Sequence, residues 1–265
     1  MKPGRDLTLG LSALVLLLGL CVLGWYFGST PLHRRLDAQS LLHTIDMKMT
    51  KVHLEQYDEK GVLAKRLVSN EITHIPQDNT FFLTAPNLDF QSNDSPDLWH
   101  LTAKQAKTHH GTESILFKQD VILNQPGTTL KTQTLHYQPK QNQATTEEGV
   151  TFDQGLTHFI ADKTRTVVDK NNHPTYAIAT TPAPKRVHFW TTRDDKLFHA
   201  YANQIEYFPE QQLITLTGNA EVQQDKHHFT APIIRYNLAK HQVITESNQD
   251  TRTRILFYPD KKNHA

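Results

Sequence analysis

The sequence has a single cysteine, Cys21, and almost no net charge. One cysteine cannot form an internal disulfide, so the fold has no disulfide framework, and an oxidising compartment is permitted but not required. A formal net charge of +1 gives no support for nucleic-acid binding, which needs a basic patch or stripe. The balanced charges also argue against a long disordered tail.

The sequence also lacks the short motifs of common catalytic sites. It contains no Gly-x-Ser-x-Gly, no phosphate-binding loop and no His-Glu-x-x-His. The chain has 16 histidines, including the adjacent pairs at 109–110 and 227–228. Adjacent strand side chains point to opposite faces, so neither pair could chelate one ion unless it lay in a turn. Both pairs stand near turn residues, where exposed polar side chains are the ordinary interpretation. Asp194 and Asp195 are more typical of a solvated turn than of catalytic carboxylates. We therefore expect no metal, no cofactor and no enzymatic activity. An active site built from residues on several strands would carry no such motif.

One long apolar run stands at the amino terminus. Residues 7–27, "LTLGLSALVLLLGLCVLGWYF", carry no charge. At about 1.5 Å per residue they can cross a hydrocarbon core of roughly 30 Å. Lys2 and Arg5 precede the run, so the positive-inside rule predicts a cytoplasmic tail at residues 1–6, although Arg34 and Arg35 weaken that bias.

Two other interpretations of this run are weaker. A cleaved signal peptide has a shorter apolar region and an Ala-x-Ala-like site, which "GWYFGSTP" does not offer. Lipoprotein processing at Cys21 needs a small preceding residue, and Leu20 stands there. The sequence favours an uncleaved transmembrane anchor, followed by a linker at residues 28–42.

Helical periodicity is scarce in the rest of the chain, where only residues 32–45 approach it. Instead, short runs such as "SILFKQDVILNQ" and "LKTQTLHYQP" alternate apolar and polar residues and are separated by Pro-Gly and Glu-Gly turns. Period-two alternation with many Thr, Val, Phe and Tyr predicts short antiparallel strands. The predicted fold class is all-β.

The strands repeat a pattern. "LHYQPKQNQATTEEGVTF" and "IEYFPEQQLITLTGNAEV" share a tyrosine, a proline two residues later and a turn glycine. A signature of an apolar residue, a spacer and Ala or Thr recurs at Leu83 and Ala85, Leu101 and Ala103, Leu130 and Thr132, Phe159 and Ala161, Phe198 and Ala200, and Phe229 and Ala231. Such repeats cannot bury an apolar face alone, so we expect stacked hairpins that share one core between two facing sheets.

Alternation predicts which side chains face this interior. The predicted set is Phe117, Val121, Leu123, Leu135, Tyr137, Val150, Phe152, Phe159, Phe198, Ile205, Tyr207, Ile214, Leu216, Val222, Phe229, Ile234 and Tyr236. The small residues Ala103, Ala161, Ala200 and Ala231 either leave room in the interior or let the sheets approach closely, and the sequence favours neither.

These features resemble a known family. The unit that begins at Phe198 is similar to the OstA-type β repeat of the lipopolysaccharide transport bridge, with Gly218, Asn219 and Ala220 at its turn. Ala220 departs from the Val often found there. The upstream order of anchor, linker, "YDEKGVLAKRLVSNEITHIPQDNTFFLTAPNLDF" and "LTAKQAKTHHG" resembles the LptC family, the inner-membrane component of that system.

The resemblance implies a twisted β-jelly-roll of stacked antiparallel hairpins behind one transmembrane helix. We expect an LptC-like jelly-roll at residues 43–180, an OstA/LptA-like repeat at residues 185–258 and a tail at residues 259–265. The second part could be a separate module or an extension of one jelly-roll. The Pro-rich residues 179–186 between them are either a module boundary or an irregular crossing.

The resemblance also implies a function. The chain would sit in the inner membrane by a single anchor with its bulk in the periplasm. It would accept lipopolysaccharide from an LptB2FG-type ABC transporter and pass it to an LptA-type periplasmic bridge protein, with no nucleic acid and no catalysis. The implied lipid-binding residues are those of the predicted interior, apart from Val121 and Ile214. The implied partner edge contains Val243, Ile244, Ile255 and Phe257.

Two other functions stay open at the level of sequence. An anchored structural or adhesive β-sandwich needs no lipid ligand. A periplasmic glycan-active enzyme could carry dispersed carboxylates.

Overall fold

The structure is a computed structural model that describes residues 45–58, 61–91, 98–109, 113–169, 174–193, 196–224, 227–237, 239–240, 242–246 and 253–256. In these ranges the only helices are two single 3-10 turns, η3 (Pro76–Asp78) and η4 (Pro139–Gln141). The all-β prediction is confirmed. The predicted anchor lies outside the described residues, and no helix within them is long and apolar enough to cross a membrane.

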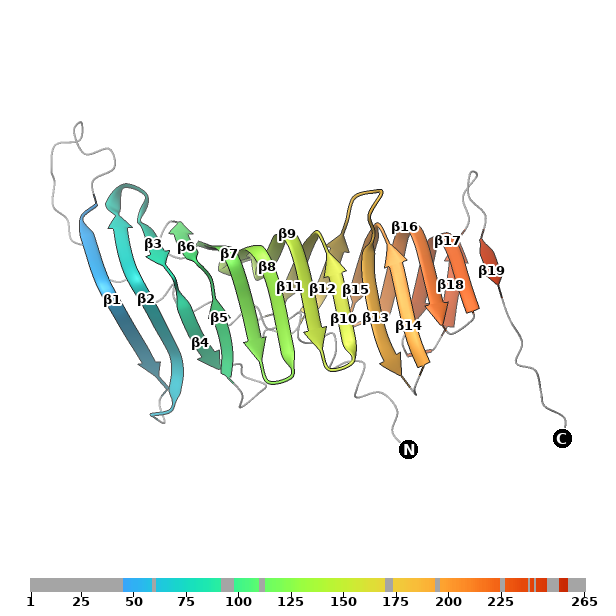
Figure 1. Ribbon diagram of the computed structural model, residues 1–265, viewed down its shortest axis with the longest axis horizontal. Coiled ribbons are helices and arrows are strands. Elements are labelled where there is room, and N and C mark those ends of the chain that lie inside the picture. The colour runs from blue at the N-terminus through green and yellow to red at the C-terminus, as the bar shows by residue number, and fades with distance from the viewer. Residues whose placement is uncertain are drawn as a thin grey trace.

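The described residues form nineteen strands in one continuous sheet, and all pairings among them are antiparallel. The strands are β1 (Met47–Tyr57), β2 (Leu63–Ile75), β3 (Thr80–Thr84), β4 (Asn87–Gln91), β5 (Leu98–Thr102), β6 (Gln105–His109), β7 (Ser114–Gln125), β8 (Thr128–Gln138), β9 (Gln143–Gln154), β10 (Thr157–Ala161), β11 (Lys163–Val168), β12 (Pro174–Thr180), β13 (Val187–Arg193), β14 (Lys196–Ala202), β15 (Gln204–Phe208), β16 (Leu213–Gln224), β17 (His227–Asn237), β18 (Gln242–Glu246) and β19 (Arg254–Leu256). They follow one another along an elongated molecule, with β1 at one end and β18 and β19 at the other (Figure 1).

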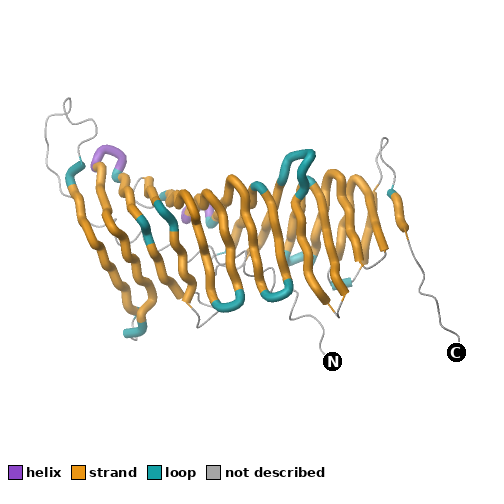
Figure 2. The backbone as a smooth tube through the Cα atoms, in the orientation of Figure 1, coloured by secondary structure: helices purple, strands orange, loops and turns teal. Residues whose placement is uncertain are grey.

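The sheet is folded lengthwise into two arms that share the long strands. Each half of a long strand pairs with different short strands: residues 143–146 of β9 pair with β11, and residues 150–154 pair with β10. The first arm contains β3, β6, β11, β12, β15 and β18. The second arm contains β4, β5, β10, β13, β14 and β19. The adjoining halves of β1, β2, β7, β8, β9, β16 and β17 complete the two arms (Figure 2).

The long strands bend at a line that we call the fold line. Their pairings shift register there, between Lys118 and Val121, between Thr132 and Thr134, and between Thr217 and Ala220. Gly149 and Gly218 have positive φ at the bends of β9 and β16, a conformation that glycine adopts without steric cost. Bulges of this kind re-aim a strand without ending it, so one strand can serve both arms.

Hydrogen bonds connect neighbouring strands along the fold line. The Thr181 amide donates to the Asn203 carbonyl (2.9 Å), and the Asn203 amide donates to the Gly218 carbonyl (2.8 Å). At the bend of β8, the Thr132 hydroxyl donates to the carbonyls of Thr134 (3.2 Å) and Glu147 (3.1 Å). These bonds satisfy backbone groups that the regular ladder leaves free at a bend.

The sequence repeat now has a structural explanation. In five of its six copies the signature lies on a second-arm segment running toward the fold line. In four of these its small residue comes just before the bend, and in β14 Ala202, two residues after Ala200, takes that place. Ala103, Ala161 and Ala231 are buried at the bend, as is Ala202, and Ala200 is buried two residues before it. A small side chain at this position lets the two arms meet closely, so the structure supports close packing as the role of these alanines.

The prolines of the repeat stand in turns of one kind. In each turn the fourth residue has positive φ and its amide donates to the proline carbonyl. The pairs are Asn79 with Pro76 (3.2 Å), Asn142 with Pro139 (3.0 Å) and Gln212 with Pro209 (3.0 Å). The repeat therefore extends one copy further toward the amino terminus than the tyrosine pattern indicates.

The Pro-rich residues 181–186 cross from β12 in the first arm to β13 in the second. Strands from the two sides of this crossing pair with each other, as β10 does with β13 and β12 with β15. Buried apolar residues form two clusters, one from Val52 to Val187 and a smaller one from Ala200 to Ile234. The sheet is thus continuous through the crossing, while the core divides near it.

Candidate functional site

The interior between the two arms is the candidate site. Strand alternation places one side of every strand toward the opposite arm. In the predicted set, the buried members are Phe117, Val121, Leu123, Leu135, Tyr137, Val150, Phe152, Phe159, Tyr207, Leu216 and Ile234. The half-buried members are Phe198, Ile205, Ile214, Val222, Phe229 and Tyr236.

The interior is closed at its centre and more open toward β18. In β7, β8 and β9 the inward side chains are almost fully buried, with Leu135 and Tyr137 at 0% exposure. In β14, β16 and β17 the inward Phe198, Val222 and Phe229 pack against the smaller cluster and are only half-buried. Apolar side chains that face a common interior and still contact solvent form a surface suited to an apolar ligand.

A small apolar cavity lies between the arms near the amino-terminal end of the sheet. Its lining comes from β2, β3, β4, β6 and β7: Leu67, Ile72, Phe81, Leu83, Leu88, Ala106, Thr108, Ile115 and Phe117. Sequence reasoning missed most of these residues because it started from the later repeats. The spacing of Leu67 and Ser69, which matches that of Leu130 and Thr132, could have identified them.

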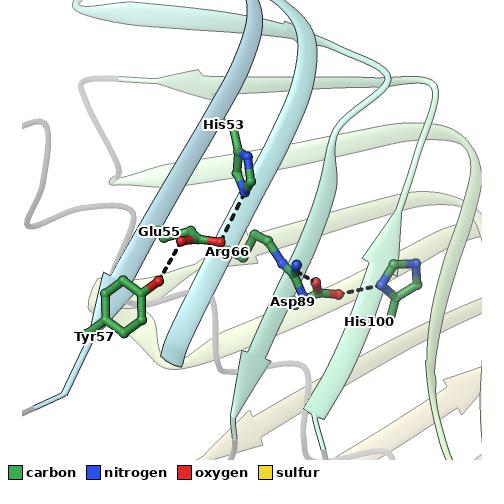
Figure 3. A network of polar contacts seen from close by, with 6 residues as sticks. All are labelled: His53, Glu55, Tyr57, Arg66, Asp89 and His100. Carbon is green, nitrogen blue, oxygen red and sulfur yellow. Dashed lines mark hydrogen bonds and ion pairs between the residues drawn. The ribbon is translucent and has the colours of Figure 1, made fainter. Parts of the chain in front are cut away.

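The outer face of the second arm is polar where β1, β2, β4 and β5 lie side by side (Figure 3). Asp89 accepts hydrogen bonds from Arg66 Nε (2.9 Å) and His100 Nδ1 (2.5 Å). On β1, the Tyr57 hydroxyl donates to Glu55 (2.6 Å), which lowers the pKa of the Glu55 carboxyl and raises the pKa of Tyr57. Paired charges of this kind keep the outer face wetted while the inner face is apolar.

Further along the same outer face, aromatic rings and imidazoles stack on one another. The His188 ring stacks on Trp190 and on Tyr201, with centroids 4.4 Å apart in both cases, and the Arg186 guanidinium lies over the Tyr201 ring, 4.8 Å from its centroid. His188 Nε2 lies 3.0 Å from His199 Nδ1. Burial, the neighbouring His199 and the Arg186 charge all lower the pKa of His188.

The histidine pairs noted in the sequence do not form a metal site within the described ranges. His227 and His228 open β17, where adjacent side chains face opposite ways. Among described residues, no group of three or more His, Cys, Asp or Glu is placed to hold a metal ion. His110, Asp194 and Asp195 lie outside the described residues.

The predicted partner edge lies at the far end of the sheet. Val243 and Ile244 on β18 are 46% and 47% exposed. Within the described part of the chain, β18 pairs only with β17, so its other edge is open. Ile255 belongs to β19, and Phe257 lies outside the described residues.

Residues 11–171 match a family model, LptC, described as lipopolysaccharide-assembly, LptC-related. No curated protein matches the chain. The chain is also similar to the crystal structure of LptH, the LptA homologous periplasmic component of the conserved lipopolysaccharide transport device from Pseudomonas aeruginosa, with 20% sequence identity and a TM-score of 0.44. That similarity covers 50% of this chain and 95% of LptH.

Proposed function

The chain belongs to the LptC family of lipopolysaccharide-assembly proteins, and from this membership we propose that it is a membrane-anchored, periplasmic bridge component that carries lipopolysaccharide. Residues 7–27 anchor it in the inner membrane. It accepts the lipid from an LptB2FG-type ABC transporter and passes it toward the outer membrane without catalysis, through the interior between the arms.

One observation supports this proposal above the others: β14, β16 and β17 each carry an inward apolar side chain that is only half-buried. Phe198, Val222 and Phe229 face the interior but are incompletely covered. Exposing an acyl chain of about a dozen methylenes to water costs on the order of 10 kcal/mol at roughly 0.8 kcal/mol per CH₂. Contact between the acyl chain and these half-buried side chains would remove apolar surface of both the lipid and the protein from water, which offsets that cost.

Edges at the two ends of the sheet suit partner binding. β1 and β18 each pair with one strand only among those described, and an open edge is a template for strand addition. We assign β18, with the exposed Val243 and Ile244, and β19 to an LptA-type bridge protein. The β1 edge meets the transporter. Movement is driven by that ATP-consuming partner.

Lipid carriage by the purified chain tests the proposal. The full chain, extracted from envelopes in mild detergent, should retain lipopolysaccharide, and Phe229→Asp should lose most of it because a carboxylate in an apolar interior opposes acyl chains. The matched control is Thr145→Asp on the outer face, opposite His136 and Arg165, which should retain the lipid. Equal retention by both variants, or none by the unaltered chain, contradicts the proposal.

A further inference from the structure

Three buried polar atoms on the inner side of the second arm have no hydrogen-bond partner in the described structure. They are the indole N–H of Trp99 and the side-chain carbonyl oxygens of Gln125 and Gln154. The Trp99 side chain is 0% exposed. Buried polar groups are nearly always hydrogen-bonded, so three such atoms in one part of the interior point to a missing partner.

The three side chains lie in one row across neighbouring strands, at the side of the second arm that is farthest from the fold line. Gln125 is paired with Thr128, and Thr128 with Gln154, so both glutamines stand one strand from Thr128. Trp99 lies on the strand beside Gln125, because His100 pairs with Asn124 in an antiparallel ladder. At about 4.8 Å between strands, the row from Trp99 to Gln154 spans roughly 15 Å.

This row is the polar limit of an apolar interior. One step closer to the fold line, the same strands place Leu101, Leu123, Leu130 and Phe152 inward, all of them buried. One step further out, the β7–β8 and β9–β10 turns are exposed at Gly127 and Leu156. Because these side chains are buried, apolar chains of a ligand can enter here only when the two arms move apart, and the head of each chain would then lie at this row.

The unpaired atoms restrict the chemistry of that head. Two glutamine oxygens can only accept, and one indole N–H can only donate. An ionised phosphate or a simple ester offers acceptors alone, so it could accept from the indole N–H but would leave the two glutamine Oε1 atoms unpaired. An amide supplies both an N–H and a carbonyl, and a hydroxyl supplies a donor.

We propose that Trp99, Gln125 and Gln154 form a recognition subsite for the amide and hydroxyl groups that join acyl chains to the sugar of an N-acylated glycolipid. The subsite rests on the proposed function, since it assumes that acyl chains enter the interior. The subsite would determine how deeply a lipid enters between the arms. The polar row would hold the amide or hydroxyl linkage by hydrogen bonds, while the acyl chains extend toward the fold line.

Binding by the full chain in lipid nanodiscs tests the subsite. The probes are an N-acylglucosamine and its O-acylated counterpart with the same chain. The unaltered chain should bind the N-acyl probe about tenfold more tightly, the value of one ordinary hydrogen bond. Trp99→Phe should lower the affinity for both probes about tenfold. The double variant Gln125→Met with Gln154→Met should abolish the preference for the amide.

Matched controls exist on outward positions. Trp190→Phe, on the outer face of the same arm, and Gln105→Met, on the outer face of the first arm, should bind like the unaltered chain. If the unaltered chain binds both probes equally and the glutamine variants change nothing, the subsite is wrong and lipid carriage stands. If the unaltered chain binds neither these probes nor lipopolysaccharide, both the subsite and the proposed function are wrong.

Discussion

Gly218 lies against the side chain of Asn203 at the fold line. A Cβ on Gly218 would come within 3.0 Å of Asn203 Oδ1, and the φ of Gly218 is +76°. The Asn203 side chain cannot move away freely, because its Nδ2 donates to the carbonyls of Thr181 and Lys185, and Asn219 Nδ2 donates to its Oδ1. One amide therefore ties the β16 bend to the crossing between the arms.

We predict that Gly218→Ala destabilises the fold by about 1–3 kcal/mol, because it adds a close contact to an unfavourable backbone conformation. Gly127→Ala is the matched control. Gly127 has a similar φ of +78° but nothing within 4 Å of the added Cβ. Chemical unfolding of the full chain in micelles should show a larger loss of unfolding free energy for Gly218→Ala than for Gly127→Ala. Equal losses would mean that the Asn203 side chain moves away from the added Cβ at no cost in free energy.

Substitutions at two inward phenylalanines should distinguish a residue that packs the core from one that contacts lipid. Phe152 is 2% exposed in the closed part of the interior, so Phe152→Ala should cost about 3–5 kcal/mol of stability. Phe229 is half-buried, so Phe229→Ala should cost about 1 kcal/mol by the area it loses but should reduce the amount of bound lipopolysaccharide. A large stability loss at Phe229 would mean that this part of the interior is closed.

Stability should decline in mild acid through His188. Its pKa in the folded chain is lowered by burial, by His199 and by Arg186. Above the ordinary value of about 6.5 the imidazole is neutral in both states. As the pH falls below that value the unfolded chain binds the proton first, so stability decreases until the folded-state pKa is passed.

His188→Phe keeps a ring in the stack and removes this titration. Between about pH 8 and pH 5, the stability of the variant should depend less on pH than that of the unaltered chain. Some dependence should remain, because burial also lowers the pKa of His136. An unchanged pH profile in the variant would show that the His188 environment contributes nothing to it.

The β18 edge should be required for binding to the bridge protein. Deleting residues 245–265 removes part of β18 and all of β19, and should abolish co-purification with an LptA-type partner while membrane anchoring is kept. Deleting only residues 259–265 should leave co-purification unchanged. Partner binding by the longer deletion would show that another edge makes the contact.

Local patterns in the sequence were enough to predict the all-β class and the inward faces of β7 to β9, because alternation at Phe117, Leu135 or Phe152 reports directly on which face is apolar. The repeat also predicted stacking, since each copy resembles its neighbour. The sequence could not reveal that one strand serves two arms. That depends on bends such as Gly218, where a short turn signal looks the same whether the strand ends or continues.

The polar positions of the interior were also beyond sequence reasoning. Gln125 and Gln154 precede turns and look like ordinary loop residues. Their inward direction follows only from the strand register, which places Leu123 and Phe152 two residues earlier on the same face. The small alanines were ambiguous for a similar reason, because the fold line that gives them a role is formed by residues distant in sequence.

Photo-crosslinking in cells tests the central claim most directly, that lipopolysaccharide travels between the two arms. A photoreactive amino acid replaces Phe198, Val222 or Phe229 on the inner side, where these side chains are half-buried, or Trp190 on the outer side. Lipopolysaccharide adducts should form at the inner positions and not at Trp190, and should disappear when ATP is depleted. Adducts at Trp190 alone, or at no inner position, would contradict the claim.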